Sequence, residues 1–270
     1  MTIHLTALHI YPVKSLGGIS LKHAALTARG LARDRRFLVV DPDGEFLTQR
    51  EYSQMATVWV DVEDDILTLA APDLDAVEVP LSPGKQPTRK VRVWNSVVDA
   101  HTVSADADRF LGDYLGKPCH LVYMPEDSVR AINPDHARPG DMVSFADGYP
   151  LLLTSEASLA DLNQRIVANG SQPVPMNRFR PNLVIGGVES GAEDGWQAIR
   201  IGDAEFRFAK PCVRCQVTTT DQASGEVRGP EPLATLATYR DSPKGVYFGQ
   251  NLIPTKLANI RVGDEVTVLA

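Results

Sequence analysis

Cysteine is scarce in this chain, which has only Cys119, Cys212 and Cys215 among its 270 residues. Three cysteines do not make a disulfide framework, and an odd number suits a reducing compartment better than a secreted protein. The sequence also lacks any apolar run of the ~18–20 residues that a membrane-spanning helix needs. Its first residues lack the basic start and apolar core of a signal peptide. These absences predict a soluble, cytoplasmic protein without a membrane partner.

Positive charge is also in deficit. The formal net charge is −7 and the pI is about 5.4, which argues against a nucleic-acid-binding surface over the whole molecule, so no nucleic-acid partner is expected. With 43% hydrophobic and 23% charged residues, the composition is that of a folded protein. The length allows one large domain or two ordinary ones. Internal repeats and low-complexity segments are absent.

Short strand patterns dominate the first 120 residues. Apolar and β-branched stretches, separated by Asp, Pro and Gly turns, occur at 6–11, 36–40, 58–62, 66–70, 77–80 and 90–94. This pattern is typical of a barrel or a sandwich. Residues 104–115 differ, because their apolar residues recur at helical spacing, with Ser104 as a candidate N-cap and Gly116 as a stop.

The second half mixes strands with one clear helix. Residues 124–150 are interrupted by four prolines and are expected to form a loop, whereas 154–166 carries its apolar residues on one helical face. Further strands are expected at 181–185, 198–201, 204–208 and 217–220, with a terminal hairpin over 260–269. The sequence therefore predicts a mainly β protein with some α structure, in two units joined near residues 116–130.

The pair Cys212 and Cys215 has a CxxC spacing with several possible meanings. A structural zinc site needs four ligands, and the only further candidates are Cys119 and the adjacent His120. A redox dithiol normally starts a helix, whereas β-branched residues follow this pair. The pair could also be ordinary buried thiols. The nearby cations Lys210, Arg214, Arg178 and Arg180 favour a thiolate, which is a suitable ligand for a soft or high-valent metal.

Several other segments offer groups that bind anions. Lys14 and Ser15 precede Gly17 and Gly18 in a turn that could cradle a phosphate, although a solvated loop is the simpler interpretation and the spacing is not that of a Walker A loop. Arginines open two strands, and Thr154 and Ser155 open a helix whose N-terminus attracts anions. Together these segments suggest a phosphate-bearing organic cofactor beside a cysteine-ligated centre.

Six motifs occur in one order along nearly the whole chain: YPVKS, GLARDRRF, LLTSEASLADLN, RFRPNLVI, CVRCQVTTTD and FGQN…RVGDEV. In this respect the sequence resembles the MOSC-domain family with its N-terminal β-barrel domain, and within it the amidoxime-reducing members and bacterial relatives that reduce N-hydroxylated compounds. The resemblance implies an N-terminal β-barrel-like domain over 1–120 and a MOSC β-barrel domain with flanking helices over 121–270.

The resemblance also implies a molybdenum cofactor, a phosphate-bearing pterin dithiolene, with Cys215 as the metal ligand and catalytic centre and Cys212 as a neighbour. The positions that match cofactor contacts in the family are Lys14, Ser15, Arg35, Thr154, Ser155, Arg180, Asn182, Arg214, Cys215 and Asn251. Eukaryotic members have a tyrosine at the position of Asn251, so that contact differs. Asp147 and His136, in the proline-rich segment, are candidates for the substrate mouth.

The implied activity is reduction of the N–O bond of a small N-hydroxylated substrate. The three cysteines leave no set for an iron–sulfur cluster, so electrons are expected from a separate protein, either a flavoprotein or an iron–sulfur or haem carrier. The main alternative is a protein that carries molybdenum cofactor or sulfur without turnover. A zinc-stabilised, non-enzymatic module is a third possibility.

Overall fold

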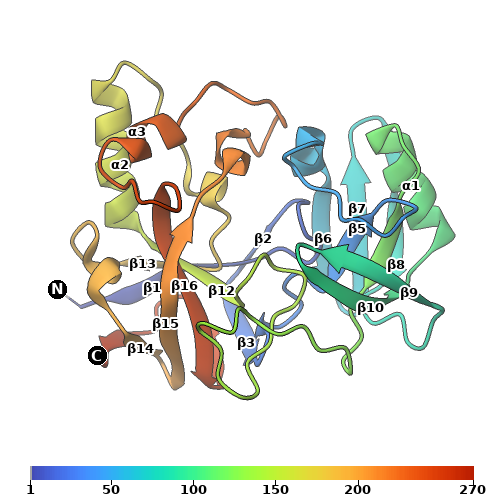
Figure 1. The fold of residues 1–270 in the computed structure, drawn as a ribbon, viewed down its shortest axis with the longest axis horizontal. Helices are drawn as coiled ribbons and strands as arrows, with labels where there is room; N and C mark the ends of the chain where they lie inside the picture. The colour runs from blue at the N-terminus through green and yellow to red at the C-terminus, as the bar shows by residue number, and fades with distance from the viewer. Residues whose placement is uncertain (1) are drawn as a thin grey trace.

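The computed structural model describes residues 2–270, which form two lobes that lie side by side (Figure 1). Strands predominate and three α-helices accompany them, which confirms the predicted mainly β fold with some α structure. The helices are α1 (Ala105–Leu115), α2 (Glu156–Ala168) and α3 (Leu233–Ala237), with 3₁₀ turns at Ser53–Thr57, Met176–Phe179, Ala192–Gly195 and Gln216–Thr219. Within the described residues, no helix combines the length and the apolar character needed to cross a membrane.

One lobe is built on an eight-stranded sheet. Its strand order is β18-β14-β15-β16-β12-β13-β1-β2, and only β12 and β13 run parallel. The strands are β1 (His4–Ile10), β2 (Ile19–Leu21), β12 (Leu151–Ser155), β13 (Leu183–Gly186), β14 (Ala198–Ile201), β15 (Ala204–Val213), β16 (Tyr247–Lys256) and β18 (Val266–Val268). A small sheet of β17 (Asn259–Arg261), β3 (His23–Thr27) and β4 (Gly30–Leu31) adjoins the same core.

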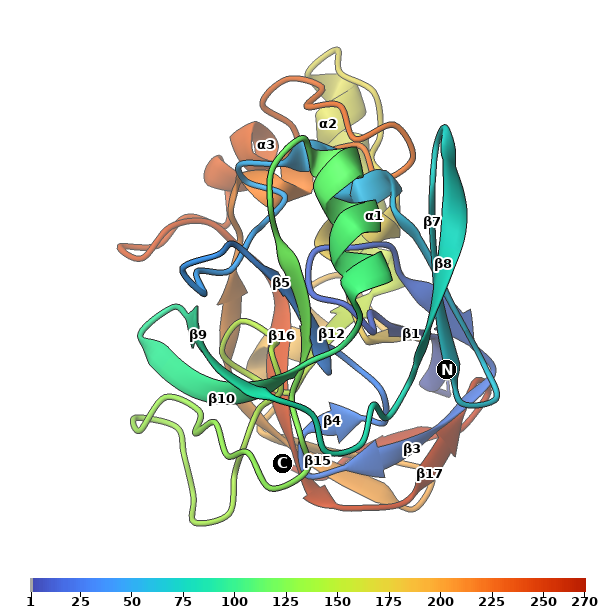
Figure 2. The same cartoon turned by 90° about the vertical axis from the view of Figure 1, so that its right-hand side faces the viewer.

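The other lobe contains two small antiparallel sheets and α1. One sheet has the order β5-β11-β10-β9 and the other the order β6-β7-β8, and α1 packs between β11 and β8 (Figure 2). The strands are β5 (Phe37–Val40), β6 (Trp59–Glu63), β7 (Ile66–Ala71), β8 (Leu74–Pro80), β9 (Thr88–Val93), β10 (Ser96–Thr102) and β11 (His120–Tyr123).

The chain's first strands complete the sheet of its second half. Leu5 and Leu8 of β1 are buried in one core with Leu183 of β13 and Phe206 of β15. Val13 and Leu16, only a few residues later, belong instead to the core beneath α1. The chain therefore crosses into the second lobe after β1 and returns to the large sheet at β2, so residues 11–18 form a crossing between the lobes. This crossing places the lysine turn at the junction, and the division of the chain at residue 120 stays a prediction.

The helix signals in the sequence are confirmed. The Ser104 side chain accepts hydrogen bonds from the amides of Asp106 and Ala107 at the start of α1, and Gly116 ends the helix in the left-handed conformation at φ 69°. Helix α2 begins two residues later than predicted, with Ser155 as its N-cap. Thr154 and Ser155 themselves are the last residues of β12.

Two strand predictions are wrong. Residues 217–220 form most of a 3₁₀ turn, because the hydroxyls of Thr218 and Thr219 bond back to carbonyls three residues earlier. The segment 260–269 turns at Gly263 but is not a paired hairpin, since β17 pairs with β3 whereas β18 pairs with β14. The first segment follows local side-chain bonds, and the second follows pairing with distant strands that short-range patterns do not reveal.

The predicted loop 124–150 has no helix or strand, but a buried arginine fixes part of its backbone. Arg130 is buried and its guanidinium donates to the carbonyls of Ser144 at 2.9 Å and Asp147 at 2.7 Å, and also to that of Ala146. Burial lowers the pKa of Arg130 to about 10, although the nearby Asp147 carboxylate opposes that shift. The clamp fixes the backbone that carries Asp147.

Candidate functional site

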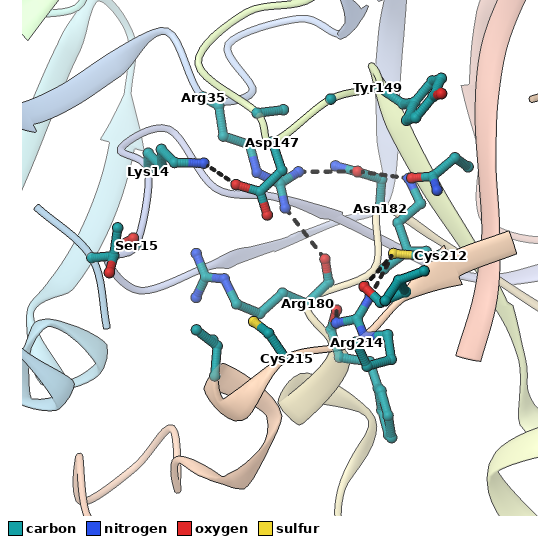
Figure 3. Close-up of a pocket in the computed structure, with 18 of the residues that line it drawn as sticks. Lys14, Ser15, Arg35, Asp147, Tyr149, Arg180, Asn182, Cys212, Arg214 and Cys215 are labelled. Carbon is teal, nitrogen blue, oxygen red and sulfur yellow. Dashed lines mark hydrogen bonds and ion pairs between the residues drawn. The ribbon is translucent and has the colours of Figure 1, made fainter. Parts of the chain in front are cut away.

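One cleft brings most of the predicted site residues together. Its lining comes from both lobes, and residues far apart in the sequence meet there (Figure 3). The predicted residues that line it are Lys14, Ser15, Arg35, Asp147, Arg180, Asn182, Cys212, Arg214, Cys215 and Asn251.

The two cysteines of the CxxC pair are free thiols with different neighbours. Cys212 lies in β15, where its sulfur accepts a hydrogen bond from Arg214 Nη1 at 3.0 Å. Cys215 lies beyond the end of that strand, and its sulfur is 3.4 Å from Nη2 of Arg50. Neither is in a disulfide. The two sulfurs are therefore presented to different parts of the cleft, as expected if only one of them is a ligand.

The third cysteine lies elsewhere. Cys119 is 3% exposed and packs in the core beneath α1, while the neighbouring His120 is hydrogen-bonded through Nδ1 to the Asp108 carboxylate at 2.6 Å. Within residues 2–270, no group of three or more His, Cys, Asp or Glu side chains is gathered for a metal. The four-ligand zinc arrangement with Cys119 and His120 is therefore not formed by the described residues.

Burial also makes Cys119 unreactive. Desolvation, with a smaller contribution from Asp108, raises the pKa of its thiol to about 12. At pH 8 only about 10⁻⁴ of it is thiolate, which is the reactive form. We expect brief iodoacetamide treatment of the native, metal-free protein to modify Cys212 and Cys215 but not Cys119, as read by peptide mass spectrometry. Unfolding in urea should expose all three, and equal labelling of Cys119 in the native protein would contradict this account.

Lys14 is the predicted phosphate-binding lysine, and it forms an ion pair with Asp147 in the cleft. Burial lowers the pKa of Lys14, and the Asp147 carboxylate opposes that shift. For Asp147, whose side chain is 67% exposed, desolvation by the surrounding cleft acts to raise the pKa, but the Lys14 ammonium, the Arg50 cation and the Trp94 N–H together hold the pKa well below its usual range. Trp94 Nε1 donates to the same carboxylate at 3.2 Å. Asp147 is thus an ionised carboxylate at the cleft, consistent with its prediction as a mouth residue.

This pairing gives a test by substitution. In Asp147→Asn the group that raises the pKa of Lys14 is lost, so burial and the cations Arg130 and Arg35 all act to lower it. We expect the Lys14 ammonium to lose its proton at a lower pH than in the unsubstituted protein, as followed by the ¹³Cε shift. The matched change Asp99→Asn, which removes the partner of the exposed Lys90, should leave the Lys14 titration where it is. An unchanged or raised Lys14 pKa in Asp147→Asn would show that Asp147 does not hold the charge.

Two arginines make cation–π contacts with the same aromatic ring. The guanidinium carbons of Arg35 and Arg180 lie 4.3 and 4.1 Å from the ring centroid of Tyr11. Arg35 Nη1 donates to the buried Asp34 at 2.6 Å, and Arg35 Nη2 to the Arg180 carbonyl at 3.3 Å. Burial lowers the pKa of Arg180 to about 10, with the Arg35 cation acting in the same direction, and the group remains protonated at neutral pH.

The backbone at these residues is strained. Ser15, Arg35, Trp94 and Arg180 have φ values of 70°, 48°, 54° and 53°, in the left-handed region that non-glycine residues seldom adopt. Each such residue costs on the order of 1–3 kcal/mol, and such strain clusters at binding sites. Gly18 has a related role, because a Cβ there would lie 2.4 Å from the Tyr11 ring. The protein thus carries this unfavourable conformational energy at residues that fix the backbone around the cleft.

Asn182 faces the cleft, but both polar atoms of its side chain already have protein partners. Its Oδ1 accepts from Arg35 Nη1 at 3.0 Å and from the Leu152 amide at 3.2 Å, and its Nδ2 donates to the His9 carbonyl at 3.1 Å. The side chain therefore orients Arg35 and joins β12 to β1. Asn251 also lines the cleft, and its Nδ2 donates to the carbonyl of Lys210 at 3.3 Å.

Arg178 and Arg214, both near the cysteines, differ in function. Arg178 is buried and donates to the carbonyl of Thr219 at 2.7 Å and to Asp221, which fixes the turn after Cys215. Arg214 reaches the cleft and donates to the Phe179 carbonyl at 2.7 Å and to Cys212. Of these two arginines, only Arg214 therefore lines the cleft.

Three predicted residues lie outside the cleft lining. The Thr154 hydroxyl donates to the sulfur of Met176, and Ser155 is fully buried, where it caps α2 and donates to the Glu193 carboxylate at 3.1 Å. A buried carboxylate beside this helix start disfavours an anion there. His136 also lies apart, with its ring 6.0 Å from that of Tyr149.

Sequence reasoning missed several residues of the lining and its support, among them four polar ones. Thr48, Gln49 and Arg50 come from the turn after β5, and the Gln49 amide donates to the Ser15 carbonyl at 2.7 Å. Gln222 bridges the lobes, accepting from Arg180 at 3.2 Å and donating to Gln49 at 3.0 Å. The motif TQREY carries no spacing signal, so only the structure reveals that this turn faces Cys215.

The cleft has an excess of positive charge. Lys14 and Arg35 are paired with Asp147 and Asp34. Arg50, Arg180 and Arg214 form no ion pair with a carboxylate among the described residues and donate instead to the Cys215 sulfur, the Gln222 amide and the Phe179 carbonyl. Five cations and two carboxylates leave a formal charge of +3 in a protein of net charge −7. This arrangement attracts an anion and can hold it by several forked hydrogen bonds.

The fold and the cleft define a class: a two-lobed, mainly β protein with a thiol beside a cationic anion-binding site. Comparison with known domains agrees with it. Residues 2–118 match the MOSC N-terminal beta barrel domain, and residues 140–267 match the MOSC domain. The chain belongs to the MOSC-domain family.

Its relatives include amidoxime-reducing components and a molybdenum cofactor sulfurase. It is 36% identical over 279 residues to mitochondrial amidoxime-reducing component 1 of Mus musculus, covering 97% of this chain and 81% of that protein. Identity to the Homo sapiens protein of the same name is 34% over 280 residues, covering 97% and 82%. Molybdenum cofactor sulfurase of Oryza sativa subsp. japonica is 34% identical over 282 residues, covering 98% of this chain and 34% of that protein.

Proposed function

We propose that this protein is a molybdenum-cofactor-dependent oxidoreductase that reduces N-hydroxylated compounds, with electrons from a separate protein. The observation that carries the proposal is the Cys215 thiol in one cleft with Lys14, Arg35, Arg180 and Arg214. Relatives named amidoxime-reducing components, similar over nearly the whole chain, support the substrate class. The cytoplasmic location remains a prediction.

The residues present fit the cofactor chemically. A cysteine thiolate is a suitable ligand for a soft or high-valent metal, and Cys215 is the cleft thiol not engaged by Arg214. Lys14, Arg35, Arg180 and Arg214 supply donors for a phosphate and for the planar edge of a pterin. Arg180 and Arg214 have no carboxylate partner within residues 2–270, so an anion there would meet charges that the protein leaves unneutralised.

The bound cofactor would supply the two-electron oxygen-atom chemistry, and the protein supplies binding, orientation and electrostatics. In the reaction the N–O bond of the substrate breaks and its oxygen leaves as water. This consumes two electrons from the donor protein and two protons from solvent, so that an amidoxime becomes an amidine. Of the protein's own groups, Asp147 is ionised beside Lys14 and can orient N–H donors of a substrate at the cleft.

The alternative is a carrier that binds molybdenum cofactor or sulfur without turnover. The relative named molybdenum cofactor sulfurase supports this alternative, although this chain spans only 34% of its length. A carrier needs Cys215 and the cationic groups but no electron donor. Both candidates therefore predict cofactor binding, and only turnover separates them.

The experiment is direct. The protein is purified, its molybdenum, zinc and pterin contents are measured, and the molybdenum-loaded form is mixed with reduced methyl viologen and benzamidoxime. We expect molybdenum and pterin in similar amounts and oxidation of two viologens per benzamidine formed. Molybdenum-loaded protein that oxidises no viologen with benzamidoxime or a hydroxylamine would favour the carrier. Stoichiometric zinc without pterin would overturn both.

A further inference from the structure

Arg50 contacts Cys215 from the lobe that contains α1, and Trp94 packs against Arg50; neither residue has an assigned task in the proposed function. Arg50 follows β5 in the turn over residues 48–51, and its Nη2 lies 3.4 Å from the Cys215 sulfur. The Arg50 carbonyl accepts a hydrogen bond from Gln216 Nε2 at 2.9 Å. The turn is thus attached at its backbone to the residue after Cys215, and its side chain reaches the sulfur. This double contact crosses from one lobe to the other.

Trp94 holds the Arg50 guanidinium in place. The guanidinium carbon lies 4.4 Å from the centroid of the Trp94 ring, and the ring meets Phe46 edge-on at 5.0 Å. Trp94 also donates from Nε1 to Asp147 at 3.2 Å. It occupies the turn between β9 and β10 with φ 54°, which is unusual for a bulky side chain, and it is 39% exposed. A strained aromatic residue with these contacts indicates a positioning function.

Arg50 differs from the cations that anchor the cleft. Lys14 and Arg35 have carboxylate partners, whereas the only side-chain acceptor of Arg50 within residues 2–270 is the Cys215 sulfur. A guanidinium has five N–H donors, so most of those on Arg50 are available to a molecule in the cleft. They lie next to the sulfur that we propose as the metal ligand. An oxygen atom that reacts at that centre comes within their reach.

We propose that Arg50, mounted on Trp94, binds the oxygen of the substrate's N–O group and orients it beside Cys215. The inference rests on the proposed function and adds a substrate-binding residue from the lobe that contains α1. As the N–O bond breaks, negative charge develops on that oxygen, and a fixed cation stabilises it more than it stabilises the bound substrate. The same cation favours neutral amidoximes and hydroxylamines over compounds with a permanent positive charge.

The test compares Arg50→Gln, Arg50→Lys and Trp94→Leu in the molybdenum-loaded protein. For Arg50→Gln we expect kcat/KM for benzamidoxime to fall by about 10²-fold while molybdenum and pterin contents stay unchanged. Lysine restores the charge without the fork, so Arg50→Lys should recover part of the loss. Trp94→Leu should lower the activity in the same direction but less. The control is Arg92→Gln, an exposed arginine on β9 paired with Glu45, which should behave as the unsubstituted protein.

A second measurement does not depend on turnover. Calorimetric titration of oxidised, loaded protein with benzamidoxime should show weaker binding in Arg50→Gln and normal binding in Arg92→Gln. Activity of Arg50→Gln equal to that of the unsubstituted protein, or loss of its molybdenum, would overturn this inference. In the second case Arg50 would serve the cofactor and not the substrate. If the unsubstituted loaded protein itself reduces no N-hydroxylated compound, the proposed function fails and this inference fails with it, whereas equal activity in Arg50→Gln overturns the inference alone.

Discussion

Replacing Cys215 with alanine is expected to reduce the molybdenum content of the purified protein at least about 10-fold and to abolish viologen oxidation with benzamidoxime. The reason is that a thiolate ligand is lost from the place where the cationic residues converge. The anion-binding groups remain, so some pterin should still bind weakly. Metal analysis and pterin fluorescence of the same preparations measure the two components separately.

The matched change is Cys212→Ala, only three positions away. The Cys212 sulfur accepts from Arg214 Nη1, so its removal frees one donor of that guanidinium but leaves the Arg214 contact to the Phe179 carbonyl. We expect Cys212→Ala to keep most of its molybdenum and activity. Retention by Cys215→Ala with loss in Cys212→Ala would show that the other sulfur is the ligand. Equal loss in both would point to a site that needs the pair.

Sequence patterns correctly predicted the elements whose stabilising interactions lie within the element itself. Helix α1 is specified by Ser104, by its apolar spacing and by Gly116, and all three act within the segment itself. The turn after Cys215 is different. Its β-branched residues favour a strand by propensity, yet the threonine hydroxyls satisfy backbone carbonyls within the turn, and the chain bends directly after the cysteine. Strand propensity therefore does not decide the conformation where side-chain hydroxyls offer the backbone carbonyls another hydrogen-bond partner.

The candidate site was predictable where a residue type alone suggests its chemistry. Lys14, Arg35, Arg180 and Arg214 stood out as cations near turns, glycines or cysteines, and the structure brings them to one cleft. Ser155 stood out equally, as a helix cap, but its hydroxyl is used by Glu193. Whether a capping residue is free for a ligand depends on a carboxylate 38 positions away in the chain, which spacing does not reveal.

Arg50, in contrast, could not be predicted as a site residue from the sequence. Nothing in its neighbourhood marks it, because its partners Trp94, Cys215 and Gln216 all lie far away in the sequence. The same is true of Gln222, which links Arg180 to Gln49 across the lobes. The residues missed are therefore those whose function arises from the meeting of two lobes. Residues 11–18 contribute to that meeting, because they leave the core of the large sheet, enter the core beneath α1 and return at β2.

The largest effect on stability is expected from Asp34→Ala, within that junction. The Asp34 side chain is fully buried, and its carboxylate accepts from the Tyr11 amide at 2.8 Å and from Arg35 Nη1 at 2.6 Å. Its removal leaves Arg35, whose side chain is only 13% exposed, without its counter-charge. Breaking a buried pair from one side typically costs about 3–5 kcal/mol. We expect a loss of that size in urea unfolding of the metal-free protein.

The comparison variants separate charge from packing. Asp34→Asn keeps an acceptor for the Tyr11 amide but not the charge, so it should lose less than Asp34→Ala. Asp99→Ala breaks an exposed pair with Lys90, both side chains being more than half exposed, and should cost no more than about 1 kcal/mol. If Asp34→Ala costs as little as Asp99→Ala, Arg35 does not depend on this carboxylate. Because an anionic cofactor would supply a new counter-charge to Arg35, the loss in Asp34→Ala should be smaller in the loaded protein than in the metal-free one.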